Sequence, residues 1–233
     1  DPWDLISYKA FAENSIPIVD IITLAATGSE YDSGGVISRT ETNDKIGYVD
    51  PHNFPRVSFL DPTYTFTVSK KQTAAGCADA MNHIIEQYFC EDSTIHNDGF
   101  MEAGLKSLMT NAVKCLENPD DYTARAEMML TCTYGCNGIY ALGNSYSGWP
   151  CHAIEHALSA YYDITHGEGL AIITPRWMKH ILCEKTVHRF VKYGVNVFGI
   201  DANQDKFEIA NQAIDATYKF FDSINIPMHL KDV

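Results

Sequence analysis

Two pairs of potential metal ligands in this sequence are each separated by four residues. Asp79 and His83 form the first pair, and His152 and His156 form the second. Residues four apart lie on the same face of an α-helix, so each pair could direct two side chains toward one ion. Holding a divalent metal between two imidazoles at this spacing is a common arrangement in proteins.

A further histidine, His166, lies ten residues beyond His156. Gly167 and Gly169 follow it, and we expect them to let the backbone turn this imidazole back toward the preceding helix. Together with the two pairs, the sequence then offers one carboxylate and up to four imidazoles. An Asp/His₃ donor set suits Zn²⁺ or Fe²⁺, and a single carboxylate leaves the bound ion positive enough to act as a Lewis acid.

The same residues allow two other interpretations. Residues 152–156 (HAIEH) match H-x-x-E-H, the inverted zinc-protease signature, in which Glu155 would activate a zinc-bound water for hydrolysis. That interpretation gives no role to Asp79, His83 or His166. In the third interpretation, the chain is a non-catalytic helical domain that binds a structural metal or none.

A turn of small, hydroxyl-bearing residues, Thr27-Gly28-Ser29-Glu30, follows a predicted strand. Such turns expose backbone N–H groups that can bind phosphate or nicotinamide. The sequence contains no complete G-x-G-x-x-G or G-x-x-x-x-G-K-[ST] motif. The turn alone therefore does not distinguish a cofactor-binding segment from an ordinary turn, and Lys45, at the tip of a predicted hairpin, is by itself typical of solvated surface.

The periodicity of the sequence changes near residue 65. Before it, β-branched and apolar runs predict a buried strand at 16–24, a hairpin over 36–49 and a short strand at 57–60. From Ser69, which with Gln72 fits a capping box, apolar residues recur every three or four positions. This pattern predicts helices at about 70–90, 122–142 and 151–162, two shorter helices within 169–198, and a last helix around 207–221. Between the first two, Leu105, Leu108, Ala112 and Cys115 mark the apolar stripe of another helix, which Asn118-Pro119 ends. We expect an α/β part over 1–65 and an all-α domain over 66–233.

The composition excludes several classes of partner. The 233 residues carry 17 basic and 30 acidic side chains, a formal net charge of −13. Nucleic acid and anionic membranes require a basic face, so neither is an expected partner. No apolar run approaches the roughly 18 residues of a membrane span. The seven cysteines are odd in number and lack C-x-x-C spacing, which indicates reduced, mostly buried thiols and a cytoplasmic protein.

Four motifs, in order and over essentially the whole chain, resemble the iron-containing (group III) alcohol dehydrogenases, and among them most of all the NAD(P)H-dependent butanol dehydrogenases. They are Ala26-Thr27-Gly28-Ser29-Glu30, Leu60-Asp61-Pro62, Asp79-x-x-x-His83 with Glu86-Gln87-Tyr88, and His152-x-x-x-His156-x₉-His166-Gly167. The resemblance implies an α+β fold of the dehydroquinate synthase-like kind. In it, 1–65 would be a partial α/β nucleotide-binding domain and 66–233 the helical metal-binding domain.

The resemblance also implies a role for each motif residue. The metal, Fe²⁺ or Zn²⁺, would be held by Asp79, His83, His152 and His166. His156 matches a histidine proposed to relay protons near the nicotinamide. Residues carried over as contacts of NAD or NADP are Thr27, Gly28, Ser29 and Lys45.

The implied reaction is hydride transfer between nicotinamide and a small aliphatic alcohol or aldehyde such as butanol or butanal. Trp149, Tyr161 and Tyr162 are expected to line the substrate pocket. The family's glycine-rich loop lies upstream of Asp1, and its final helices lie beyond Val233, so the chain is expected to be a fragment whose own activity is uncertain. A homodimer is a further expectation.

Overall fold

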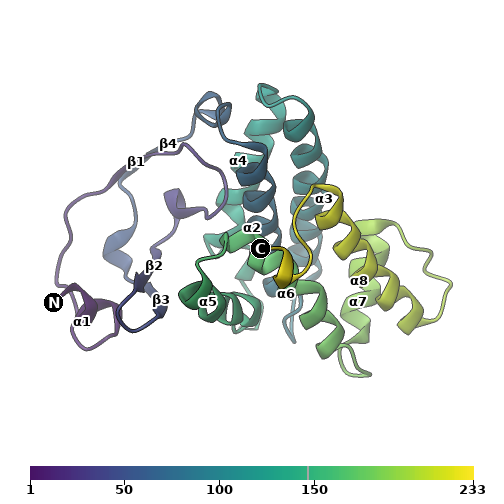
Figure 1. Ribbon diagram of the computed structural model, residues 1–233. Coiled ribbons are helices and arrows are strands. Elements are labelled where there is room, and N and C mark those ends of the chain that lie inside the picture. Colours follow the sequence, from purple (N-terminus) through teal and green to yellow (C-terminus); the bar gives the residue numbers. More distant parts are fainter. Residues whose placement is uncertain (146) are drawn as a thin grey trace.

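The computed structural model describes residues 1–145 and 147–233, and its strands all lie in the N-terminal quarter (Figure 1). A short helix, α1 (Pro2–Ile6), precedes them. The strands are β1 (Val19–Ile21), β2 (Gly34–Arg39), β3 (Asp44–Val49) and β4 (Val57–Phe59). Three short 3₁₀ helices separate or follow these strands, η1 (Ser29–Tyr31), η2 (Pro51–Asn53) and η3 (Pro62–Thr65).

The strands form two separate two-stranded pairs. β2 and β3 are antiparallel, with Ile37 opposite Ile46, which confirms the predicted hairpin. β1 pairs in parallel with β4, so that Val19 lies opposite Val57. The prediction of a long buried strand over 16–24 is wrong, because β1 has three residues and Val19 is 61% exposed. The apolar side chains of β1 form a face of the strand that no other described part of the chain covers.

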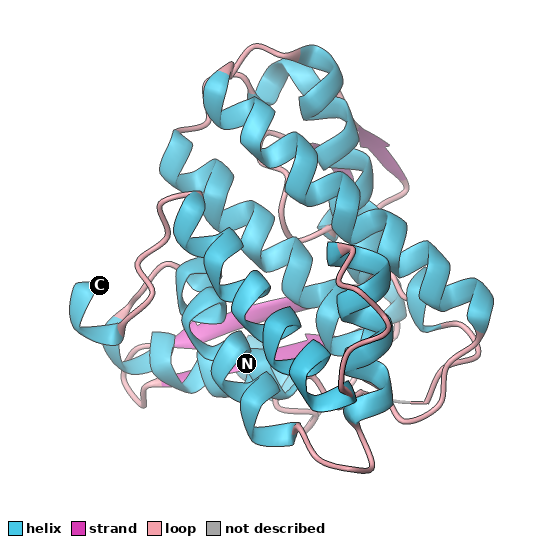
Figure 2. Ribbon diagram, turned by 90° about the vertical axis from the view of Figure 1, so that its right-hand side faces the viewer, coloured by secondary structure: helices cyan, strands magenta, loops and turns pink. Residues whose placement is uncertain are grey.

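Helices make up the rest of the chain. They are α2 (Lys70–Tyr88), α3 (Ile95–Glu117), α4 (Tyr122–Cys136), α5 (Pro150–Tyr162), α6 (His166–Ile181), α7 (Val187–Phe198) and α8 (Lys206–Ser223). Two 3₁₀ turns complete the elements, η4 (Ile139–Ala141) and η5 (Leu230–Asp232). Figure 2 shows the helices as a layered bundle with the strands behind them.

The central helix of the bundle is α2. Every residue from Thr73 to Tyr88 is buried, and α2 packs against α3, α4, α5 and α6. Its start is fixed as predicted, because the Ser69 hydroxyl accepts a hydrogen bond from the Gln72 N–H at 3.2 Å. A polar side chain on α2 is therefore placed inside the domain with little freedom to move.

Two helices differ in extent from their sequence patterns. α3 ends as predicted but begins at residue 95, well before its first stripe residue Leu105, because the Thr94 hydroxyl accepts from the Asn97 N–H and caps the helix there. α4 ends at residue 136 rather than 142, since Gly138 takes a left-handed conformation with φ of 86° and starts η4. In both cases a local polar or glycine signal decided the end of the helix.

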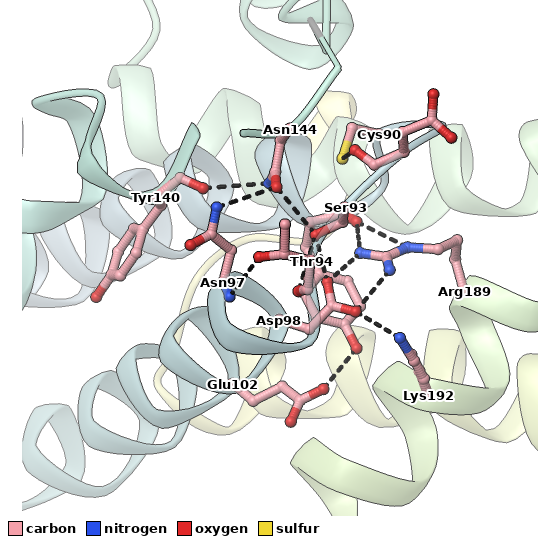
Figure 3. Close-up of polar contacts among 12 residues, drawn as sticks. Cys90, Ser93, Thr94, Asn97, Asp98, Glu102, Tyr140, Asn144, Arg189 and Lys192 are labelled. Atoms are coloured by element: carbon pink, nitrogen blue, oxygen red, sulfur yellow. Dashed lines mark hydrogen bonds and ion pairs between the residues drawn. The ribbon is translucent and has the colours of Figure 1, made fainter. Parts of the chain in front are cut away.

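A buried polar cluster joins α3 to α7 (Figure 3). Asp98 on α3 accepts from Arg189 at 2.7 and 2.9 Å and from Lys192 at 2.6 Å, both on α7. The Ser93 hydroxyl donates a further hydrogen bond to Asp98 at 2.7 Å. Burial opposes ionisation of Asp98, but these donors outweigh it and lower its pKa to about 2. The cluster therefore carries a permanent charge pair at neutral pH.

The seven cysteines carry free thiols, and five of them are buried. Across the described residues, no helix combines the length and the apolar character that crossing a membrane requires.

Candidate metal centre

The four predicted metal ligands meet at one carboxylate oxygen inside the bundle. The Oδ1 atom of Asp79 lies 3.4 Å from Nε2 of His83, which is one turn further along α2. The same oxygen lies 3.6 Å from Nε2 of His152 and 3.6 Å from Nε2 of His166. Three imidazole nitrogens therefore surround one buried oxygen, and they belong to the residues that the family resemblance implied as metal ligands.

Two helix starts bring the distant histidines to α2. His152 lies in the first turn of α5, and His166 is the first residue of α6. The positive end of a helix dipole faces each of these positions, which favours the carboxylate of Asp79 opposite them. The sequence signal for this convergence was the i,i+4 spacing on α2 together with the short α5–α6 connection.

Close helix contact at Gly167 positions His166. A Cβ built at residue 167 would lie 2.0 Å from the carbonyl oxygen of Ala75 on α2. The expectation that Gly167 supplies unusual backbone freedom is wrong, because the residue lies inside α6 with an ordinary negative φ. It is the missing side chain that lets the start of α6 approach α2.

The donor set fits a divalent metal ion. Within the described residues, Asp79 Oδ1, His83 Nδ1 and His152 Nε2 are buried side-chain atoms without a hydrogen-bond partner. Unpaired buried polar atoms are costly, and a bound cation would satisfy the acceptors among them. The ligand atoms of Asp79, His152 and His166 lie within 4.8 Å of one another. His83 is not a member of that group of three. Its ring stacks on the ring of His152, with the two ring centroids 4.8 Å apart.

The charge states of these residues are strongly shifted. Burial opposes ionisation of Asp79, but the surrounding histidines hold its pKa well below the usual range. Burial lowers the pKa of His83 to about 4, which keeps that imidazole neutral. At His152 the effect of burial is outweighed by Asp79 and Glu86, which raise the pKa to about 9. A metal ion must therefore displace a proton from His152 when it binds.

Two buried glutamates touch the outer ring nitrogens of the candidate ligands; no role was predicted for Glu86, and Glu155 was predicted only as the water-activating residue of an H-x-x-E-H hydrolase. Glu86 Oε2 contacts Nδ1 of His152, and Glu155 Oε2 contacts Nδ1 of His166. Glu86 falls two turns after Asp79 on α2, and Glu155 one turn before Ser159 on α5. Because Glu155 is fully buried and already bound to other side chains, it is poorly placed to activate a water for hydrolysis.

Lys45 lies in β3 and reaches this centre from the N-terminal part. Its ammonium is 3.5 Å from Glu155 Oε2, and its side chain is only 16% exposed. Taken alone, the sequence suggested solvated surface at this position, and that suggestion is wrong. The contact places a cation from the hairpin beside the histidine cluster, where β3 packs against α5.

The Thr27-Gly28-Ser29 turn packs on α4 rather than on the histidines. Gly28 has φ of 70°, and a Cβ there would lie 2.8 Å from the carbonyl oxygen of Cys132. The Thr27 hydroxyl accepts from the Ser29 N–H at 3.2 Å, and both side chains are exposed. The turn is thus held rigidly, with two hydroxyl-bearing residues open to a ligand.

His156 lies one turn beyond His152 on α5 and is half-buried. Its ring centroid is 6.3 Å from that of His152 and 5.5 Å from that of His166. Burial, with smaller contributions from the neighbouring His166 and Lys45, lowers its pKa to about 4. His156 is therefore a neutral imidazole beside the candidate ligands.

The expected aromatic lining is only partly present. Trp149 packs its ring edge against His83 and His152, with centroids 5.9 and 5.3 Å apart. Tyr161 and Tyr162 are 69% and 73% exposed at the end of α5. These two tyrosines are therefore largely open to solvent, and their place in a substrate pocket stays a prediction.

The helical domain places one carboxylate and three imidazoles around a buried point, and it is joined to a strand-containing N-terminal part. This combination is typical of a metal-dependent protein. Comparison with known families is in agreement. The model of the "Fe-containing alcohol dehydrogenase family, C-terminal" matches residues 73–233, and the model of the "iron-containing alcohol dehydrogenase" family matches residues 1–62. The chain belongs to the iron-containing alcohol dehydrogenase family.

Individual relatives are similar over the whole chain. NADH-dependent butanol dehydrogenases A and B of Clostridium acetobutylicum are 48% and 46% identical to it. The NADPH-dependent aldehyde reductase YqhD of Escherichia coli is 34% identical. Each alignment covers 100% of this chain and 60% of the relative. The chain therefore spans about 60% of the length of these relatives.

A solved structure has the same fold. The crystal structure of NADH-dependent butanol dehydrogenase A from Thermotoga maritima superimposes with a TM-score of 0.95 at 37% identity. The superposition covers 100% of this chain and 57% of that one. This likeness confirms the α+β fold class with a partial N-terminal domain and a helical domain.

Proposed function

We propose that this chain carries the metal-binding part, and the adjoining portion of the cofactor-binding part, of an NAD(P)-dependent alcohol dehydrogenase or aldehyde reductase. Its substrates would be small aliphatic alcohols and aldehydes such as butanol and butanal, because relatives across the whole chain are named butanol dehydrogenases. The metal would be Fe²⁺ or Zn²⁺. In this proposal residues 1–65 form part of the cofactor-binding domain, and residues 66–233 form the metal-binding domain.

One observation carries the proposal. The buried Oδ1 of Asp79, without a hydrogen-bond partner among the described residues, is approached by three imidazole nitrogens from three different helices. Such an arrangement is costly unless a cation occupies it. Asp79, His83, His152 and His166 would hold that cation, which when bound supplies Lewis-acid chemistry for hydride transfer.

The chain's own residues would bind the cofactor and move a proton. Thr27, Gly28 and Ser29 offer a rigid turn with open hydroxyl groups, and Lys45 brings a cation to the edge of the histidine cluster. The neutral imidazole of His156 can accept the hydroxyl proton of an alcohol at one ring nitrogen and release another proton from the other. Trp149 would help exclude water from the centre.

The test is metal content and turnover of the chain beside two variants. After loading with Fe²⁺ or Zn²⁺, elemental analysis is expected to give about one ion per chain. Asp79→Asn should lose that ion, whereas His188→Ala, which alters an exposed histidine on α7, should retain it. Butanal-dependent oxidation of NADH and of NADPH, followed by absorbance, measures activity and cofactor choice.

Two results would contradict the proposal. Metal that survives Asp79→Asn, with an esterase or peptidase activity lost in Glu155→Gln, would instead establish the H-x-x-E-H hydrolase. Stoichiometric metal without any aldehyde-dependent oxidation of NADH or NADPH would show that the chain is a metal-binding domain without dehydrogenase activity.

A further inference from the structure

Glu86 joins α2 to the first turn of α5 and is 1% exposed. Its Oε1 accepts hydrogen bonds from the N–H groups of Cys151 at 2.5 Å and His152 at 3.4 Å. Trp149, at the N-cap position of α5, makes no side-chain capping bond, so Glu86 provides the cap from another helix. The second oxygen, Oε2, contacts Nδ1 of His152.

Glu155 occupies the corresponding place beside His166 and is fully buried. Its Oε2 contacts Nδ1 of His166 and lies 3.5 Å from the Lys45 ammonium, while Oε1 accepts from the Ser159 hydroxyl. The absence of a side chain at Gly169 makes room for it, since a Cβ there would lie 2.9 Å from Cγ of Glu155. Three polar contacts thus fix the orientation of this carboxylate.

Each carboxylate contacts the Nδ1 atom of its own histidine, Glu86 that of His152 and Glu155 that of His166. A carboxylate acceptor at Nδ1 keeps the hydrogen on that atom, which leaves the lone pair of Nε2 free to bind a metal. In His152 and His166 it is Nε2 that faces Asp79 Oδ1. His83 differs, because its Nδ1 is buried without a hydrogen-bond partner in the described part of the chain.

We propose that Glu86 and Glu155 are positioning residues of the metal centre, which hold His152 and His166 with Nε2 directed at the ion. The proposal rests on the proposed function. Neither glutamate touches the metal; each fixes the tautomer and the ring orientation of one ligand, and Glu86 also fixes the start of the helix that carries it.

The formal charges agree with this assignment. Asp79, Glu86 and Glu155 are three buried carboxylates, and Lys45 contacts one of them, Glu155. Once metal binding has displaced the proton of His152 and the imidazoles are neutral, these four side chains have a formal charge of −2. One divalent ion balances that charge. A buried carboxylate that neither bound the ion nor oriented a ligand would be difficult to explain at this site.

The test is a Co²⁺ titration of the purified chain, followed by the visible absorption bands that report the geometry of bound cobalt. Glu86→Gln and Glu155→Gln keep the size of each side chain and remove its charge. Each is expected to raise the Kd for Co²⁺ about 10- to 100-fold and to shift the absorption bands. Glu102→Gln is the matched control, because this buried glutamate binds Tyr88 and Asn196 at 2.8 Å and touches none of the histidines.

The outcomes separate the two proposals. If wild-type chain and Glu102→Gln bind Co²⁺ alike while both other variants bind weakly with shifted bands, the positioning role is supported. Unchanged Kd values and spectra in Glu86→Gln and Glu155→Gln, with wild-type binding intact, would overturn the positioning role alone. A wild-type chain that binds neither Co²⁺ nor Zn²⁺ would overturn the proposed metal centre and this role together.

Discussion

At the scale of single residues, the missing side chain of Gly167 allows the candidate ligand His166 to lie close to α2. A Cβ at this position would lie 2.0 Å from the carbonyl oxygen of Ala75, and that oxygen cannot move without distorting α2. Gly167→Ala is therefore expected to lower the free energy of unfolding by about 3 kcal/mol. Metal affinity should fall with it, because His166 moves with the start of α6. Urea unfolding and a Zn²⁺ titration measure the two effects.

Gly99→Ala is the control for that prediction. Gly99 also lies within a helix, α3, but nothing lies within 4 Å of a Cβ built there. The substitution should raise stability by about 0.5 to 1 kcal/mol, since alanine loses less backbone entropy than glycine in a helix. Equal effects of the two substitutions would show that helix propensity, and not the α2–α6 contact, matters at Gly167.

His156 is expected to matter for proton movement and not for metal binding. His156→Ala should leave the metal content near one ion per chain and lower turnover by about 10²- to 10⁴-fold. The reason is that this neutral imidazole lies beside the candidate ligands, and in the proposed site its ring takes no part in holding the ion. The measurement is aldehyde reduction by the metal-loaded protein, with His188→Ala alongside. Turnover that is unaffected by His156→Ala would rule out the proton relay.

At the scale of elements, the ion pair between α3 and α7 predicts a specific pH dependence. The pKa of Asp98 is about 2 in the folded chain and near 4 when unfolded. Because the folded pKa is the lower one, the stabilisation is complete above about pH 4 and is lost as the pH falls toward 2. It amounts to about 2 kcal/mol in total, of which about half disappears by about pH 3.

Asp98→Asn removes this dependence. At about pH 6 the variant should be several kcal/mol less stable than the wild type, because the guanidinium of Arg189 stays buried without its carboxylate. The difference should shrink by about 1 kcal/mol on acidification to about pH 3. Urea unfolding at stepped pH measures it. A difference that stays constant with pH would mean that Asp98 stabilises the chain without its charge.

Spacing within one helix could be predicted from the sequence, and contacts between helices could not. Asp79 and His83 share a face of α2 because the helical repeat alone dictates it. The pairing of Glu86 with His152 depends instead on where α5 crosses α2, and no local pattern encodes that crossing. The same limit explains β1, since an apolar strand indicates a face that needs covering but not what covers it.

At the scale of the whole molecule, the candidate centre lies where the two parts of the chain meet. Asp79, His83, His152 and His166 all come from the helical part, whereas Lys45 comes from the hairpin. The resemblance to a known family implied roles for all five, the first four as metal ligands and Lys45 as a cofactor contact. Lys45 contacts Glu155 across 110 positions, and only the folded chain reveals that contact.

The open face of the β1–β4 pair predicts that the 233-residue chain self-associates. Val19, Ile21, Val57 and Phe59 lie on one face of this parallel pair, and each is about half exposed or more. Contiguous apolar surface of this kind, next to unpaired strand edges, favours association with a second copy. Light scattering coupled to gel filtration is expected to show a mass above that of the 26.0 kDa monomer at micromolar concentration.

Charge on that face should restore the monomer. In the double variant Ile21→Lys with Phe59→Lys, two like charges replace exposed apolar groups without filling or emptying the core. We expect the mass to return to that of one chain, with the free energy of unfolding of the helical part unchanged within about 0.5 kcal/mol. Ile95→Lys is the control, since Ile95 is even more open to solvent, at 88% exposed, but lies at the start of α3 and not in the strand pair. A monomeric wild type, or a control as effective as the double variant, would show that this face does not drive association.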